Sequence, residues 1–304
     1  MKVDIEKTKC KKFEVFLGMP KGLLRCVQPF VFFLEMDGEN LRIEIRDECE
    51  RRIIFTRDSG IEINRVYSIF LDLESLLHIF EGSFLTLRDV IISGDEDGVF
   101  YNAFREQIIS HRLQCQKPSK YFDIHRDKFL DYEAVLSSDL LSRWHSLREE
   151  LDVVNQMYLY ATGDTGFTID VICAFLIELS EPLTELIGQP KDSSKYLKDF
   201  LENVINRYGK GIFKREIDFG LDKIISCLVN TRVNIMHIRV NKKTSSLNGE
   251  ESFLYAVKMS YLYRCTILDK LEVKPGIYKN RLAELISYMN NWNGVLEKLF
   301  EKIS

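Results

Sequence analysis

Two residues in the C-terminal half of the chain have the side-chain types and spacing that chemistry on RNA requires. The sequence there reads Leu228-Val-Asn-Thr-Arg232-Val-Asn-Ile-Met-His237, so four residues separate the arginine from the histidine. A histidine titrates near neutral pH and can move a proton from a 2′-hydroxyl or to a 5′-oxygen. An arginine keeps its charge and can hold a phosphate while negative charge builds on it. Because the 2′-hydroxyl itself attacks the phosphate, this cleavage needs no metal ion and spares DNA.

The spacing alone leaves such a site incomplete. Five residues of ideal helix turn through about 500°, which places Arg232 and His237 about 140° apart around the axis. From a straight helix the two side chains cannot point at one spot, although they can line a broad groove with a second copy of the motif facing them. A related pattern also arises by chance, since Arg105 and His111, with five residues between them, fit an Arg-x(4–6)-His pattern in the mixed N-terminal half. We set that second pair aside because it lies outside the helical region.

Local basic residues accompany the motif. Arg239, Lys242 and Lys243 follow it directly, while Lys210, Lys214 and Arg215 precede it by one helix. With a net charge of -4, the chain as a whole offers no positive surface for nucleic acid, so RNA binding needs a local patch of this kind. The alternative is an ordinary solvated surface.

The N-terminal half shows the pattern of strands. Lys12-Phe-Glu-Val-Phe-Leu and Leu41-Arg-Ile-Glu-Ile-Arg alternate, and Asp37-Gly38 predicts a hairpin after a strand over residues 27–36. We expect further strands at residues 52–56, 66–71 and 90–93, with a short helix over residues 73–80 between the last two. These elements favour an antiparallel sandwich or curved sheet.

From about Arg126 the hydrophobic period becomes that of helices. Helices are predicted over residues 138–160, 168–187 with a break near Pro182, 195–208, 219–240, 251–271 and 278–303. The chain therefore predicts an α+β fold with two domains: a β-rich sensing or regulatory domain over residues 1–125 and an all-α bundle over residues 126–304.

The cysteines, histidines and apolar runs of the sequence indicate which metals, cofactors and location to expect. The seven cysteines are odd in number and form no Cys-x-x-Cys pair, which argues against a disulfide framework and a zinc site. His78, His111, His125 and His145 have no metal-ligand spacing, and no phosphate-binding glycine loop occurs, so we expect neither metal nor cofactor. The charged N-terminus and the short apolar runs predict a cytoplasmic protein with no membrane segment.

The helical half resembles the HEPN superfamily, and its ApeA-like anti-phage branch in particular. The ApeA-like pattern places Asp/Asn-Thr-Arg-Asn-x-x-x-His after a hydrophobic helix, and Leu228-Val-Asn-Thr-Arg232 with His237 is similar to it in order and spacing. Upstream, Leu140-Leu-Ser-Arg-Trp144 resembles the opening of that domain. Residues 169–186 resemble the family's acidic helix, with Glu178 or Glu181 as its glutamate. The likeness spans about residues 126–280.

The resemblance implies a HEPN-type bundle and a metal-independent endoribonuclease that works as a homodimer in anti-phage defence by abortive infection. It implies Arg232 as the phosphate clamp and His237 as the proton-transfer residue, with host tRNA or other host or phage RNA as substrate and a phage-derived trigger at the N-terminal domain. The family usually has a polar residue after the arginine, whereas this chain has Val233, so Asn234 is the candidate supporting contact. Two alternatives remain: a non-catalytic RNA- or protein-binding dimerisation module, and the toxin of a toxin–antitoxin pair.

Overall fold

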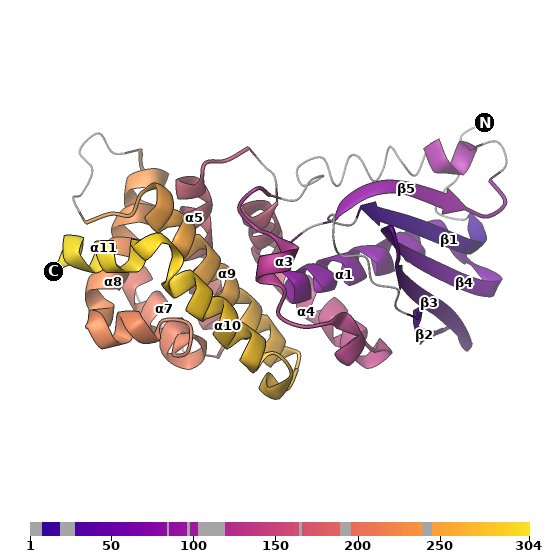
Figure 1. Ribbon diagram of the computed structural model, residues 1–304. Coiled ribbons are helices and arrows are strands. Elements are labelled where there is room, and N and C mark those ends of the chain that lie inside the picture. Colours follow the sequence, from indigo (N-terminus) through magenta and orange to yellow (C-terminus); the bar gives the residue numbers. More distant parts are fainter. Residues whose placement is uncertain are drawn as a thin grey trace.

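An antiparallel sheet forms the N-terminal part of the chain and helices form the rest (Figure 1). The computed structural model describes residues 8–18, 28–83, 85–95, 98–102, 119–163, 166–188, 196–238 and 245–304. Over these residues the order of elements agrees with the α+β class that the sequence predicts. The HEPN-type arrangement of the helices stays a prediction.

Five strands make one sheet in the order β2-β3-β4-β1-β5, and every neighbouring pair is antiparallel. The strands are β1 (Lys9–Gly18), β2 (Phe30–Met36), β3 (Glu39–Asp47), β4 (Glu50–Glu62) and β5 (Thr86–Ile92). The hairpin between β2 and β3 turns at Asp37 and Gly38, which both have positive φ (55° and 76°), as a tight two-residue hairpin turn requires. On β3, Leu41, Ile43 and Ile45 are buried, which confirms the alternation read from the sequence.

The prediction of a strand over residues 66–71 is wrong, because these residues belong to helix α1 (Ile63–Glu81). The buried residues Ile63, Val66, Tyr67 and Phe70 follow the helical spacing of three and four, and the predicted helix over residues 73–80 simply continues it. Helix α1 contacts β1 and β4, so among the described residues the strands form a single antiparallel sheet packed with a helix; of the two predicted forms, a sandwich or a curved sheet, the sandwich is wrong.

Helices fill the remainder of the described chain. After the short α3 (Ile124–Asp127) and the 3-10 turn η1 (Tyr132–Ala134), their bounds are α4 (Ser138–Thr162), α5 (Ile169–Glu178), α6 (Ser180–Leu186), α7 (Leu197–Val204), the π-helical η3 (Ile205–Gly209), α8 (Lys214–Met236), α9 (Gly249–Lys270), η4 (Pro275–Ile277), α10 (Lys279–Asn290), η5 (Trp292–Gly294) and α11 (Val295–Ile303). Pro182 lies in the first turn of α6, where the missing N–H costs little, and this confirms the predicted break.

A fully buried arginine joins the sheet unit to the bundle. Arg264 of α9 donates to the carbonyl oxygens of Ile79 (2.6 Å) and Phe80 (2.8 Å) at the end of α1, and to that of Asp127 (2.8 Å). Its guanidinium also lies 3.6 Å from the centroid of the Phe129 ring. These donors satisfy carbonyls that the end of a helix leaves without partners.

The core runs through the whole molecule. Buried apolar residues of the sheet, of α1 and of the bundle form one continuous cluster. The division at residue 125 therefore stays a prediction from the change in sequence pattern. Among the described residues, none of the helices combines the length and the apolar character that crossing a bilayer requires.

Candidate active site at the end of helix α8

The last turn of α8 and the end of α5 carry the residues that the sequence singled out. Helix α8 bends at Gly220, whose φ of 138° suits only glycine, and from there it runs to Met236. Its buried residues Ile224, Leu228 and Thr231 face the bundle, where α8 packs against α5. This packing brings the end of α5, at Glu178, beside Arg232.

Arg232 is held by a two-point contact with Glu178. Its Nε donates to Glu178 Oε2 at 2.5 Å and its Nη2 donates to Glu178 Oε1 at 2.8 Å. The two side chains are 23% and 27% exposed, so the pair sits at the surface of the bundle. The hydrogen bonds to Glu178 raise the pKa of Arg232 above its ordinary value, against a smaller opposing effect of burial. A planar fork of this kind fixes the orientation of the guanidinium and leaves Nη1 outside the contact.

His237 meets that remaining nitrogen. Arg232 Nη1 lies 3.3 Å from His237 Nε2. A guanidinium only donates hydrogen bonds, so in a hydrogen bond between these two atoms Nε2 is the acceptor. The 140° separation of a straight helix does not keep the two groups apart. His237 is the C-cap of α8, and its φ of −102° lies outside the ideal helical geometry from which that angle is calculated.

Two exposed apolar residues, Met236 and Ile238, flank the histidine in the chain and form what we call the exposed tip. Ile238 has a φ of 45° and is 87% exposed, while Met236 on the other side of His237 is also exposed. A β-branched residue in the left-handed region is strained by about 1–3 kcal/mol, and strain of this kind gathers at functional sites. An apolar tip beside a charged pair is also the composition that a protein interface uses.

Asn234 lies on the buried side of α8. Its side chain is 5% exposed, whereas Arg232 is partly exposed and His237 is exposed. Two residues along a helix correspond to about 200° around its axis, which accounts for the difference. The role of Asn234 as a supporting contact stays a prediction, and its burial does not favour direct contact with substrate.

The predicted basic patch around the pair stays a prediction, because its nearest members lie outside the described residues. Lys214 and Arg215 lie in the first turn of α8, before the bend at Gly220, whereas Arg232 and His237 lie at its other end. Arg215 is engaged there, since its Nη1 donates to Glu297 Oε1 at 2.7 Å. Arg239, Lys242 and Lys243 lie outside the described residues, as do Arg105 and His111 of the discarded pair.

A set of hydrogen bonds beside the site was not predicted from the sequence. Asn230 Nδ2 donates to the carbonyl oxygen of Ser245 (3.1 Å) and to its hydroxyl (2.7 Å), and the Leu247 N–H donates to Thr231 Oγ1 at 2.7 Å. These bonds fix the chain where it returns after residues 239–244. The Asn-Thr pair directly before the motif arginine was the available signal, because these side chains often bond to nearby backbone.

Comparison with protein-family models, with curated proteins and with solved structures finds no match to this chain. The assignment of a function therefore depends on the geometry of the site and on the resemblance of the motif. Within the described ranges, no group of three or more His, Cys, Asp or Glu side chains is placed to hold a metal ion.

Proposed function

We propose that this protein is a metal-independent endoribonuclease that cleaves RNA through its own 2′-hydroxyl, with Arg232 and His237 as the catalytic pair. The observation that carries the proposal is the contact between Arg232 Nη1 and His237 Nε2, at an exposed helix end, with Glu178 holding the other edge of the guanidinium. An arginine that served structure alone would need only its carboxylate partner. This one also presents a free edge to a histidine.

The geometry gives each side chain a distinct task. His237 Nε2 takes the proton of the 2′-hydroxyl, whose oxygen attacks the adjacent phosphorus and displaces the 5′-oxygen. The products are a 2′,3′-cyclic phosphate and a 5′-hydroxyl, and the proton for that hydroxyl comes from an acid. Arg232 Nη1 faces the position of the phosphate and stabilises the charge that grows on its oxygens. Glu178 prevents the guanidinium from rotating out of place.

A second copy of this chain supplies the missing acid in this proposal. Pairing of two chains through the helical region places a second Arg232–His237 pair opposite the first, and the exposed tip formed by Met236 and Ile238 is the surface on which we expect them to meet. A role in anti-phage defence, by cutting host tRNA or other host or phage RNA after a phage-derived trigger reaches the sheet, depends on the family resemblance alone. A toxin of a toxin–antitoxin pair would use the same chemistry.

The rival function is a non-catalytic module that binds RNA or a partner protein. Two observations favour it: Val233 stands where the family pattern has a polar residue, and Asn234, the nearest substitute, is buried. Under this alternative the Arg232–Glu178 contact is structural, and His237 is a surface residue that follows it.

The deciding experiment is cleavage of a pool of single-stranded RNA and tRNA in EDTA. We expect wild type to cut, and His237→Ala and Arg232→Ala to lose at least about 100-fold in rate, as general acid–base groups usually contribute. His145→Ala is the control, because this histidine is also partly exposed and paired with a carboxylate, Asp72, at 2.7 Å. Cutting that survives in both motif variants would place the site elsewhere. RNA binding without cutting by wild type would support the rival.

A further inference from the structure

An exposed aromatic ring stands at the start of α5, the helix that carries Glu178. Phe167 directly precedes the N-cap of this helix and is 43% exposed, although phenylalanine is usually buried. Its ring packs on that of Phe175 in α5, with the two centroids 5.6 Å apart and the ring planes tilted by 56°. Phe175 is half-buried and packs against the core in turn. One ring of the pair is therefore anchored, and it supports the other at the surface.

The aromatic pair lies beside the candidate active site. Phe175 and Glu178 are three residues apart, so they share one face of α5, with about 5–6 Å between their Cβ atoms. Side chains of a helix lean toward its N-terminus, which brings Glu178 over the turn that carries Phe175. Glu178 holds Arg232, and Arg232 contacts His237. Phe175 and the candidate catalytic pair are therefore neighbours on this face of the helix.

Both carboxylates of α5 already have partners. Asp170 Oδ1 accepts from the Ser252 hydroxyl (2.6 Å) and from the Gly249 N–H (3.0 Å), and both oxygens of Glu178 accept from Arg232. Stacking requires no free cation, because every nucleobase offers an apolar π-face to an aromatic ring. An exposed aromatic ring near a guanidinium thus matches the two chemical parts of a nucleotide, its base and its phosphate.

We propose that Phe167 is the stacking platform for an unpaired base of the RNA, at a nucleotide next to the bond that is cut. This inference rests on the proposed function, because it names the form in which RNA reaches the Arg232–His237 pair. One ribose separates a base from its phosphate, a step comparable with the single helical turn between Phe175 and Glu178. In a duplex the neighbouring base pairs cover both faces of each base, so the substrate class is single-stranded RNA, including loops and ends.

A base fits this ring better than a second protein molecule does. The core of a protein interface is a contiguous apolar surface. The chain neighbours of Phe167 are Gly166 and Thr168, which are exposed and supply no large apolar side chain. Stacking uses a single ring and reads no base-specific hydrogen bonds, so we expect only a modest sequence preference at this nucleotide.

Cleavage of RNAs that contain one abasic ribonucleotide tests the platform. This residue keeps the 2′-hydroxyl and the phosphate and lacks only the base, and it is placed on the 5′ side or on the 3′ side of the cleaved bond. We expect Phe167→Ala to lower kcat/KM on unmodified RNA by about 5- to 140-fold, as loss of one stacked base does. Wild type should lose a similar factor on one of the two abasic RNAs. Phe167→Ala should lose nothing further on that RNA, because the base that the ring contacts is already absent.

Two further variants separate stacking from a structural role. Phe167→Trp keeps an aromatic face and should cut unmodified RNA at close to the wild-type rate. Phe33→Ala is the matched control, because this phenylalanine of β2 is 52% exposed and lies in the sheet, and it should leave cleavage unchanged.

A crosslinking readout does not depend on cutting. Single-stranded RNAs carrying 5-iodouridine at successive positions couple, on irradiation, to an aromatic ring on which that base stacks. With His237→Ala, which leaves the RNA intact, mass spectrometry should place the crosslink on Phe167. A crosslink there in a protein whose wild type never cuts RNA would support the platform and remove the nuclease, so the two failures are distinguishable.

Three results would overturn the platform. The first is cleavage by Phe167→Ala at the wild-type rate, and the second is equal cleavage of both abasic RNAs and the unmodified strand. The third is the absence of both cleavage and crosslinking. A loss of self-association in Phe167→Ala, measured by analytical ultracentrifugation, would also overturn it, because a second copy of the chain would then cover the ring.

Discussion

At the scale of single residues, Glu178 contributes to this site by orienting the Arg232 guanidinium. An exposed ion pair adds little to stability, because solvent screens it and two long side chains lose freedom. A two-point fork at 2.5 Å and 2.8 Å instead fixes direction, and here the direction leaves Nη1 facing His237. The role of Glu178 is therefore to position Arg232. Its loss should lower the rate of RNA cleavage more than the stability of the fold.

Glu178→Gln tests this role. The amide keeps the shape of the side chain but loses the charge, so we expect the rate of RNA cleavage to fall about tenfold or more while the melting temperature changes little. Single-turnover cleavage in EDTA measures the rate. Glu181→Gln is the control, because this exposed residue lies three positions further and influences Arg232 only through its charge. A loss of rate in the control as large as in Glu178→Gln would remove the case for the fork.

His78 makes the stability of the protein depend on pH. It is fully buried on α1 with its Nε2 2.8 Å from Thr162 Oγ1, and burial, with a smaller contribution from Arg264, lowers its pKa to about 3. The unfolded chain protonates this ring below its ordinary pKa of about 6.5, whereas the folded protein does not until about pH 3. The contribution of His78 is thus fully present above pH 6.5 and is lost as the pH falls toward 3.

Urea unfolding of wild type and His78→Gln at several pH values measures this effect. Between pH 6 and pH 4 the wild-type free energy of unfolding should fall by about 1.4 kcal/mol per pH unit more steeply than that of the variant, which corresponds to one proton. Glutamine can still bond to Thr162 but does not titrate. Equal slopes for the two proteins would mean that His78 takes up its proton in the folded state.

At the scale of the element, local pattern predicted most of the structure and failed where two patterns overlap. Alternation predicted β1 and β3, and the helix predicted from residue 138 begins there as α4, where the Ser137 hydroxyl accepts from the Leu140 N–H. The run over residues 66–71 is β-branched and aromatic, so its composition favoured a strand. Its buried residues Val66, Tyr67 and Phe70 follow the helical spacing, and the helix continues to residue 81, with every residue buried from 72 onward.

The sequence predicted only part of the candidate site. The types and spacing of Arg232 and His237 were visible in the sequence, and so were the acidic residues Glu178 and Glu181 on an earlier predicted helix. The contact of Arg232 with His237 was not, because an ideal helix separates the two side chains and only the helix end at Met236 relaxes that separation. The choice of Glu178 over Glu181 depends on how α5 and α8 pack, across 54 residues of sequence.

The end of α1 offers a test at this scale. Gly82 has a φ of 74°, and an added Cβ would lie 2.6 Å from Arg264 Nη1 and 2.9 Å from the Asp127 side chain. Gly82→Ala should cost more than about 2 kcal/mol, since the left-handed backbone alone costs alanine about 1–2 kcal/mol and the buried arginine cannot move aside freely. Urea denaturation gives the free energy.

Gly38→Ala is the matched control for that prediction. Its φ is 76°, yet nothing lies within 4 Å of the added Cβ, so it should show the cost of the backbone alone. Equal losses for the two variants would mean that the contact around Arg264 relaxes without cost.

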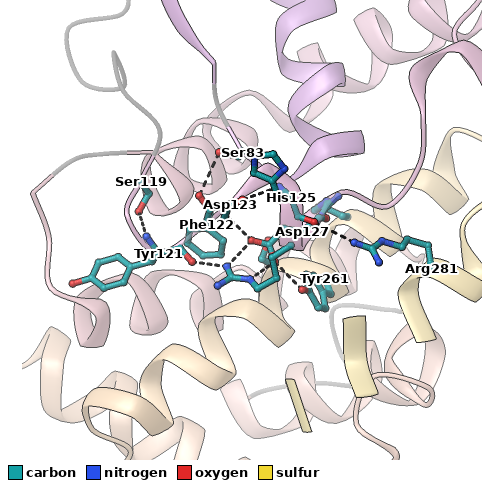
Figure 2. Close-up of polar contacts among 12 residues, drawn as sticks. Ser83, Ser119, Tyr121, Phe122, Asp123, His125, Asp127, Tyr261 and Arg281 are labelled. Carbon is teal, nitrogen blue, oxygen red and sulfur yellow. Dashed lines mark hydrogen bonds and ion pairs between the residues drawn. The ribbon is translucent and has the colours of Figure 1, made fainter. Parts of the chain in front are cut away.

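At the scale of the whole molecule, Arg264 makes three of the hydrogen bonds that connect the end of α1 and the linking segment, residues 119–134, to α9. Figure 2 shows a further one, from the Tyr261 hydroxyl of α9 to Asp127 of this segment (2.8 Å). Arg264 satisfies three carbonyl oxygens from α1 and the linking segment, all within a core that is continuous from sheet to bundle. A buried carbonyl that loses its partner costs about 1–3 kcal/mol, so the loss of this arginine should exceed the effect of most single substitutions. Coupling between a sensing unit and a catalytic bundle would have to pass through this region.

Arg264→Met tests the coupling. Methionine fills much of the volume but donates no hydrogen bond, so we expect a loss of several kcal/mol and a separation of thermal unfolding into two transitions, one for each half. Differential scanning calorimetry resolves the transitions. Arg215→Met, at an arginine that bridges elements within the bundle only, should keep a single transition. A single transition in Arg264→Met as well would show that the remaining contacts, which include those of Asp72 with Trp144 and Arg148, are sufficient to couple the halves.

The most direct test of the central claim is the chemistry of the cut itself. An RNA that wild type cleaves in EDTA should be resynthesised with one 2′-deoxynucleotide on the 5′ side of the cleaved bond. We predict that wild type cuts the all-ribose strand to leave a 2′,3′-cyclic phosphate and a 5′-hydroxyl, and that it does not cut the modified bond. His237→Ala should form neither product from the all-ribose strand. Cleavage of the modified bond, or a 5′-phosphate product, would contradict the account, because neither can come from attack by the 2′-hydroxyl.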